Sequence, residues 1–196
     1  MKGFFSIITI FLFISISQAQ NLKYNLAYFG ETFTHPGLKL CVEQTLFLKN
    51  RGQTVDTISS ISERYQIFST YNVACYHRWQ TNATILIYPE IAYRYTMKKG
   101  FFWEATTAIG YLRTFYTDET FSVDENGTIS KIPFAGRNGF IYLISVGFGD
   151  DISKTKIRNP IKWYVKPTLY WQYPYNGYWL RHFSLDLGIK LLFGSK

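Results

Sequence analysis

The chain has 196 residues, of which 19% are aromatic and only 17% charged, and its formal net charge is +8. Globular domains usually carry about 25% charged residues, so this sequence is rich in rings and poor in charge. Its hydrophobic content of 47% argues against disorder, and its 14 glycines and 6 prolines follow no period, which excludes a collagen-like chain. Beyond residue 19, no segment approaches the roughly 20 apolar residues that a membrane-spanning helix requires.

The first 19 residues have the pattern of a secretory signal peptide. Lys2 provides a charged start, residues 4–16 are almost entirely apolar, and Ser17 and Ala19 precede a cleavage point before Gln20. A membrane anchor is the alternative interpretation, but the apolar segment is too short to span a bilayer and lacks a stop-transfer flank. We therefore expect residues 1–19 to be removed on export, leaving residues 20–196 as one domain.

Apolar residues alternate with polar or small residues along the whole of the expected mature chain. A period of two indicates β-strands that each have one apolar face. The clear alternations cover residues 38–48, 65–75, 83–93, 101–111, 140–148, 162–172 and 183–193. A weaker alternation over residues 22–29 raises the number of predicted strands from seven to eight. No segment has the apolar stripe of a helix, so the sequence predicts an all-β fold.

The apolar strand faces could point either into a soluble core or outward into lipid. Trp103 and Tyr111 flank one apolar face, and Trp163 and Trp171 flank another, each pair being eight residues apart. A tilted strand of that length rises roughly 20 Å, close to the apolar band between the aromatic girdles of outer-membrane barrels. The last predicted strand ends on Phe193, which resembles the carboxy-terminal insertion signal of such barrels. We therefore predict an antiparallel transmembrane β-barrel of eight strands in the outer membrane, with these five residues in its aromatic girdle.

Charged side chains of both signs share the strand face opposite the apolar residues. In a narrow barrel they can fill the lumen as hydrogen-bonded ion pairs, whereas on a soluble protein the same face would be solvated. If the apolar faces point outward, the charged side chains form a polar network that plugs the lumen. The predicted members are Lys39, Glu43, Glu90, Arg94, Glu104, Lys162, Lys166, Asp186 and Lys190. Cys41 and Cys75 fall on opposite strand faces, so we expect two free thiols.

The connections follow from a carboxy-terminus placed in the periplasm. Residues 114–138 then form a long extracellular loop, in which residues 124–127 (DENG) indicate a tight turn. Residues 96–100 form a periplasmic turn. Residues 50–63 become an unusually long periplasmic turn, and an extracellular position for them stays open as an alternative.

Four short strings lie at intervals over most of the expected mature chain. They are residues 34–40 (THPGLKL), 110–115 (GYLRTF), 135–138 (AGRN) and 172–176 (QYPYN). Together they resemble a group of small, poorly described outer-membrane β-barrels from Bacteroidota. The resemblance implies the cell envelope and the barrel fold, and it implies no reaction.

The three histidines are the candidates for catalysis. On the predicted threading His35, His77 and His182 all lie towards the extracellular end, with Asp118 and Ser184 as possible partners. Histidine suits general-base work near neutral pH, and some outer-membrane barrels are proteases or lipid A-modifying acyl hydrolases. Histidines at strand ends also hydrogen-bond at the level of the lipid headgroups, and the sequence alone identifies no set of nucleophile, base and orienting group. We favour the second interpretation.

The remaining patterns exclude several classes of site. No Cys/His spacing is that of a metal site, no glycine loop would hold a phosphate, and no basic face is interleaved with exposed rings as nucleic-acid binding requires. We expect no metal, no cofactor and no nucleic acid, and a monomer whose partners are outer-membrane lipid, lipopolysaccharide and the barrel-insertion machinery. The favoured function is non-enzymatic, namely envelope anchoring or ligand contact through the extracellular loops. The alternatives are a lipid A hydrolase or protease with rim histidines, and a soluble exported lipocalin-like binder.

Overall fold

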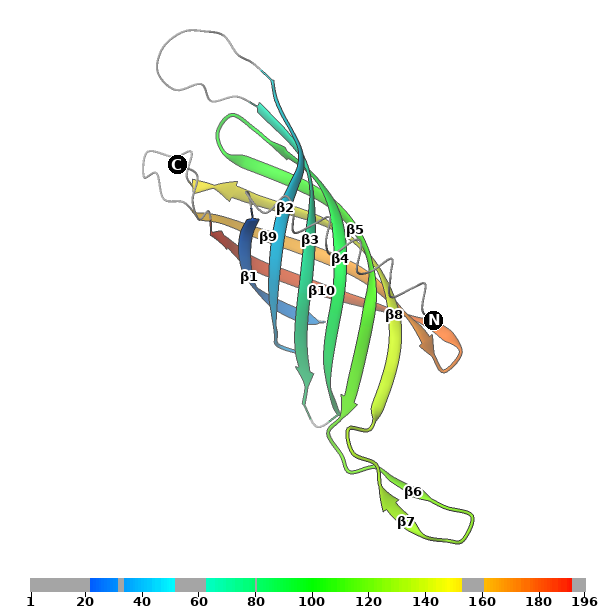
Figure 1. Ribbon diagram of the computed structural model, residues 1–196. Helices are drawn as coiled ribbons and strands as arrows, with labels where there is room; N and C mark the ends of the chain where they lie inside the picture. The colour runs from blue at the N-terminus through cyan, green and yellow to red at the C-terminus, as the bar shows by residue number, and fades with distance from the viewer. Residues whose placement is uncertain (1–21, 32–33, 52–62, 80, 153–160, 192–196) are drawn as a thin grey trace.

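The computed structural model describes residues 22–31, 34–51, 63–79, 81–152 and 161–191, which form a closed antiparallel β-barrel (Figure 1). The barrel strands are β1 (Leu22–Glu31), β2 (Gly37–Arg51), β3 (Glu63–Arg78), β4 (Asn82–Thr96), β5 (Phe101–Tyr116), β8 (Gly136–Asp151), β9 (Ile161–Tyr175) and β10 (Tyr178–Leu191). The predicted all-β fold of eight antiparallel strands is confirmed. No helix among the described residues is long and apolar enough to cross a membrane. The expected signal peptide, residues 1–19, lies outside the described residues.

Barrel strands that follow one another along the chain also pair with one another in the sheet. β1 closes the barrel by pairing with both β2 and β10. This closure leaves no unpaired edge in the main sheet, because every strand has a partner on each side. It also brings the first and last strands together, so that Glu31 at the end of β1 lies opposite Ser184 on β10.

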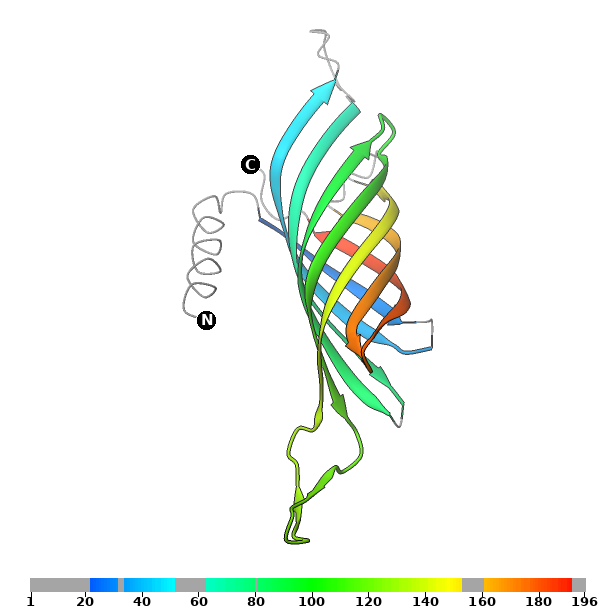
Figure 2. The ribbon, with the colours of Figure 1, turned by 90° about the vertical axis from the view of Figure 1, so that its right-hand side faces the viewer.

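The two ends of the barrel differ, and we call them the mouth and the base. At the mouth, the connection between β5 and β8 carries β6 (Phe121–Val123) and β7 (Ile129–Lys131), a hairpin that projects beyond the barrel (Figures 1 and 2). The long loop expected over residues 114–138 is shorter, residues 117–135, because β5 and β8 continue into it from both sides. The base holds the turn at residues 97–100 and the ends of β2 and β3 that precede and follow residues 52–62, which lie outside the described residues.

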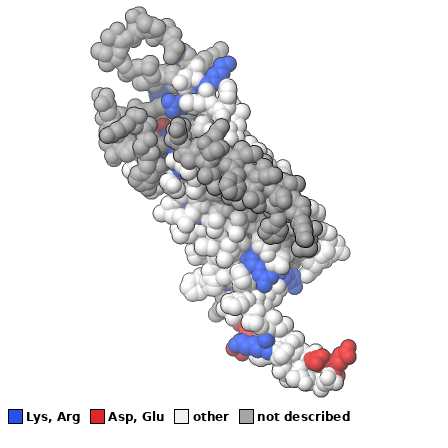
Figure 3. Space-filling view, viewed as in Figure 1, with Lys and Arg blue, Asp and Glu red and all other residues white. Residues whose placement is uncertain are grey.

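The outer wall of the barrel is apolar. Every barrel strand exposes large apolar side chains, for example Leu26, Leu40, Val73, Ile91, Ile109, Val146, Leu169 and Ile189. On the face shown in Figure 3, the charged residues lie towards the two ends, and the described surface between them is almost entirely uncharged. Water does not favour so large a continuous apolar surface.

The aromatic residues predicted for the girdle belong to the outward-facing parity of their strands. Trp103 and Trp163 lie towards the base, with Trp103 packed against Tyr93 at a centroid distance of 5.5 Å. Tyr111 lies towards the mouth, as does Trp171, which is stacked on Tyr142 at 5.9 Å. Phe193, the fifth predicted member, lies outside the described residues.

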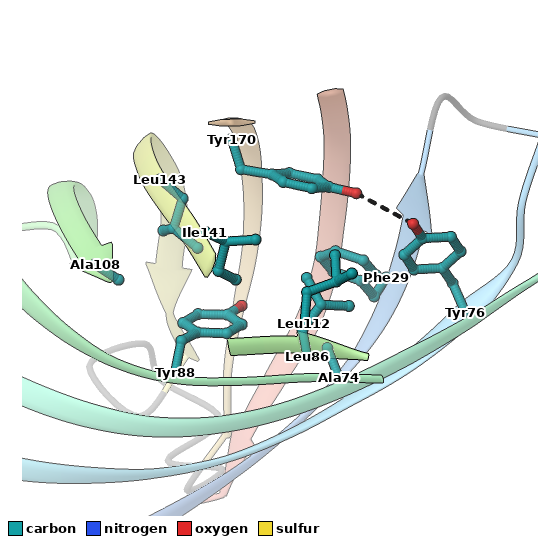
Figure 4. Packing of buried hydrophobic residues seen from close by; sticks show 10 residues of the cluster. All are labelled: Phe29, Ala74, Tyr76, Leu86, Tyr88, Ala108, Leu112, Ile141, Leu143 and Tyr170. Atoms are coloured by element: carbon teal, nitrogen blue, oxygen red, sulfur yellow. Dashed lines mark hydrogen bonds between the residues drawn. The ribbon is translucent and has the colours of Figure 1, made fainter. Parts of the chain in front are cut away.

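The half of the lumen nearer the mouth is filled by apolar packing (Figure 4). The cluster consists of Phe29, Ala74, Tyr76, Leu86, Tyr88, Ala108, Leu112, Ile141, Leu143 and Tyr170. Within it, the hydroxyl of Tyr170 donates a hydrogen bond to that of Tyr76 at 3.5 Å. The sequence pattern predicts a lumen plugged by a polar network and does not predict this apolar cluster.

Candidate functional site

A network of buried ion pairs fills the lumen towards the base. Arg94 on β4 donates to Glu43 on β2 from Nη2 at 2.9 Å and to Glu104 on β5 from Nη2 at 2.8 Å. Lys190 on β10 reaches the same two carboxylates at 3.2 and 3.3 Å. The Arg94 guanidinium also lies 4.0 Å from the ring centroid of Phe68, a cation–π contact. Four strands are thus joined through the lumen by four charged side chains.

Further ion pairs occupy the rest of the lumen between the apolar cluster and the base. Lys166 contacts Glu90 at 2.5 Å, and Lys39 contacts Asp186 at 2.6 Å, all four side chains being buried. Each of these carboxylates has one oxygen in a hydrogen bond and a second buried oxygen without a partner, Oε2 of Glu90 and Oδ1 of Asp186. Nearer the base, Lys162 contacts Asp151 at 2.6 Å.

The structure places all nine residues of the predicted polar network inside the barrel, where they are buried. Sequence reasoning missed Asp151, the partner of Lys162, although it shares the inward parity of β8. With Asp151 included, five acidic and five basic side chains are fully buried in the lumen between the apolar cluster and the base, and the partly buried Lys23 adds a further cation 3.7 Å from Glu43. This balance matters because a buried charge without a partner is costly.

A separate charged group lies at the mouth, around the carboxylate of Glu31. Arg78 donates from Nη2 to both oxygens, at 3.2 and 3.0 Å. Nδ1 of His182 forms a hydrogen bond with Oε1 at 2.7 Å, whereas Nδ1 of His35 forms one with the backbone carbonyl oxygen of Glu31 at 3.2 Å and lies 3.1 Å from Oε2. Because an ionised carboxylate and a carbonyl oxygen only accept hydrogen bonds, each of these ring nitrogens donates. Glu31 is buried, and its partners come from β3, β10 and the connection that follows β1.

The predicted histidines therefore separate into two groups. His35 and His182 meet at Glu31, whereas His77 is exposed on the outer face of β3, with its ring against Trp79 at 5.8 Å. Asp118, predicted as a possible partner, lies on the exposed connection that leads to β6. The charged group of Glu31, Arg78, His35 and His182, which we call the mouth group, thus contains two of the three candidate histidines.

The His182 ring is held in place on two sides. It stacks on Tyr170 with a centroid distance of 4.6 Å and an interplanar angle of 5°, while Glu31 holds Nδ1. Its other nitrogen, Nε2, is buried and has no hydrogen-bond partner. Ser184, two residues further along β10, also has a buried hydroxyl without a partner. A base and an orienting carboxylate are therefore present, but no hydrogen bond joins Ser184 to His182.

Glu31 and Arg78 are functional candidates that sequence reasoning missed. Arg78 stands 47 residues from Glu31 in the chain and His182 stands 151 residues from it, so only His35, four residues after Glu31, has a local spacing to it. The signal that was available is the inward parity of Glu31 on β1, two residues after Phe29. In the part of the chain that the structure describes, no group of three or more His, Cys, Asp or Glu side chains could hold a metal ion.

Solved structures with a similar fold include several outer-membrane proteins. The outer-membrane enzyme PagL aligns with a TM-score of 0.47 and 13% identity, over 86% of this chain and 98% of its own. Neisserial surface protein A aligns with a TM-score of 0.49 and 8% identity, over 88% and 96%. The N-terminal β-barrel domain of Pseudomonas aeruginosa OprF aligns with a TM-score of 0.41 and 12% identity, over 88% and 97%. No protein-family model matches the sequence, and a comparison with curated proteins also gave no match.

Proposed function

We propose that this protein is a small outer-membrane β-barrel with a closed lumen, which acts without catalysis by presenting the β6–β7 hairpin outside the cell. One observation carries the proposal: the wall exposes apolar side chains while ion pairs lie inside. Ile109, on the wall, is 68% exposed, whereas Arg94, in the lumen, is 1% exposed. This is the arrangement of a barrel whose outer solvent is lipid.

The closed lumen argues against a diffusion pore. The apolar cluster fills the part nearer the mouth, and the network around Arg94 fills the part nearer the base. Eight strands form a barrel that is just wide enough for side chains to fill. An ion would have to displace both layers in order to cross.

The hairpin has the exposed surface that ligand contact requires. Phe121, Val123 and Ile129 are each more than half exposed, while Asp124 and Glu125 lie at the turn between the two strands. In this proposal the mouth faces outward, which makes the hairpin extracellular. Outer-membrane lipid and lipopolysaccharide surround the wall, and the barrel-insertion machinery assembles the chain. We expect a monomer, because a closed barrel has no free sheet edge through which a second copy could add a strand.

Membrane fractionation, heat-modifiable migration on SDS gels and planar-bilayer conductance together test the proposal. We expect the full chain to be exported and cleaved, to fractionate with the outer membrane, to migrate differently after boiling, and to give no sustained current. A detergent-free soluble monomer would support the lipocalin-like alternative and overturn the membrane proposal. Sustained open-channel currents would overturn the closed lumen.

A second candidate function, a lipid A hydrolase or protease, is supported by one contact. Glu31 holds Nδ1 of His182, as an orienting carboxylate holds a general base. Mass spectrometry of lipid A from cells with and without expression tests the hydrolase. Acyl loss that disappears in His182→Ala and persists in His77→Ala would favour catalysis over our proposal.

A further inference from the structure

A polar cavity opens at the mouth of the barrel, on the mouth side of the apolar cluster. Its volume is about 210 Å³, and its wall includes Arg78, Thr84, Thr114, Arg137 and His182. Tyr76, which also belongs to the apolar cluster, lines it as well. Sites for drug-sized ligands have volumes of roughly 300–1,000 Å³, so this cavity fits a single small group.

The charge that lines the cavity is positive. Arg78 and Arg137 contribute to the wall, and no Asp or Glu is among the described residues that line it. Arg137 donates from Nη1 to the neutral side chain of Asn176 at 2.9 Å, so that hydrogen bond does not compensate its charge. Arg78 contacts Glu31 through Nη2, while its buried Nε has no hydrogen-bond partner.

The buried nitrogen of His182 is the second observation that points to a ligand. The His182 side chain is only 8% exposed and lines the cavity. Its Nδ1 is committed to Glu31, whereas Nε2 is buried without a partner. Buried polar atoms almost always have a partner, so one without calls for an explanation. A bound group supplies one, because a protonated ring would donate from Nε2 to an oxyanion.

We infer that this cavity binds a small oxyanion, the phosphate group of a polar molecule. Guanidinium groups match the geometry of phosphate and carboxylate, and charge-assisted hydrogen bonds to them are strong. The hydroxyls of Thr84 and Thr114, which lie 3.3 Å apart, provide neutral groups for the carrier. The site is separate from the β6–β7 hairpin, and it requires neither catalysis nor a particular orientation in the membrane.

Calorimetric titration of the full-length mature protein, folded in a neutral detergent, tests the inference. The probes are glucose 6-phosphate and inorganic phosphate, with glucose as the uncharged control. We expect saturable binding of both phosphate probes, weakened by added salt, and much weaker binding of glucose. Glucose that binds as tightly as glucose 6-phosphate, or no saturable binding of either phosphate probe at millimolar concentration, would overturn the inference.

Matched variants then place the binding in the cavity. Arg137→Gln and His182→Gln should each weaken glucose 6-phosphate binding by roughly tenfold or more, because each removes a charge-assisted contact. The controls are Arg113→Gln and His77→Gln, which change the same residue types near the same end of the barrel but outside the cavity. Heat-modifiable migration confirms that each variant is folded. Equal weakening by the controls would contradict the assignment.

Two sources could supply the phosphate, a soluble molecule or a lipid headgroup. Adding phosphatidic acid to the detergent micelles distinguishes them. If phosphatidic acid competes with glucose 6-phosphate in the wild type, and Arg137→Gln loses both the binding of glucose 6-phosphate and the competition, the cavity accepts a headgroup. If phosphatidic acid does not compete, the saturable binding belongs to a soluble phosphate. Both results support the site, and both are independent of whether the hairpin contacts a partner.

Discussion

Arg94 and Glu104 are direct cross-strand neighbours on β4 and β5, and their side chains form a forked contact inside the lumen. Nε and Nη2 of Arg94 both donate to Oε2 of Glu104, at 2.9 and 2.8 Å. The same guanidinium reaches across to Glu43 on β2, a strand that β3 separates from β4. One arginine therefore cross-links the wall of the barrel as well as filling its interior.

Removing that arginine should destabilise the barrel strongly. Arg94→Leu leaves Glu43 and Glu104 buried with Lys190 as their shared close cationic partner, and breaking a buried pair in this way costs about 3–5 kcal/mol. Lys131→Gln is the control, because it removes an exposed ion pair with Glu119 that is worth about 1 kcal/mol or less. Urea unfolding in detergent, followed by gel migration, measures both. Equal small effects would mean that the network contributes little.

A charge on the wall distinguishes a lipid-facing surface from a solvated one. Ile109 and Val123 are almost equally exposed, at 68% and 69%, but the first lies on the barrel wall and the second on the hairpin. Ile109→Lys should destabilise the folded protein in lipid by about 2–4 kcal/mol, the cost of lysine near the bilayer midplane. Val123→Lys should change stability little. Refolding yields and unfolding in lipid vesicles measure both, and a neutral Ile109→Lys would contradict the membrane proposal.

The alternation of residues was enough to predict that the charges share one face of the wall, and the spacing of the aromatic residues then favoured the lumen for that face. Period two fixes the face of each side chain, so Lys39 and Asp186 could be assigned to one face without knowing that they touch. The apolar cluster could not be predicted in this way. Leu86 and Ile141 lie on segments that are apolar on both faces, and the sequence gives no sign that the layer of ion pairs ends and an apolar layer begins there.

The mouth group depends on register and on closure, which no local pattern encodes. Glu31 and His182 meet because β1 pairs with β10, and that pairing joins the two ends of the barrel sequence. A shift of one residue in this register would move Glu31 to the opposite face. Composition and residue pattern therefore predicted an apolar outer wall, whereas the group around Glu31 could be found only from the folded structure.

Glu31 should oppose the binding of an oxyanion at the mouth, because its carboxylate competes for Arg78 and His182. Glu31→Gln keeps the shape of the side chain and removes this charge. We expect glucose 6-phosphate to bind roughly fivefold more tightly, since one charge near a wet surface contributes about 1 kcal/mol. Calorimetric titration of the variant measures the change. Unchanged or weaker binding in a folded variant would indicate that Glu31 positions the cations rather than competing for them.

The orientation of the barrel can be read from proteolysis of the hairpin. Lys131 is 58% exposed on β7, outside the barrel, so trypsin added to intact cells should cleave after it if the mouth faces outward. Lys131→Gln should remove that cleavage.

Because β6 and β7 pair with each other and not with any barrel strand among the described residues, replacing residues 119–132 by a Gly-Ser link should leave folding and gel migration unchanged. Cleavage at Lys131 only after the outer membrane is permeabilised would place the mouth in the periplasm and reverse the proposed orientation. Loss of folding in the shortened chain would show that the hairpin contributes to the stability of the barrel as well as extending from it.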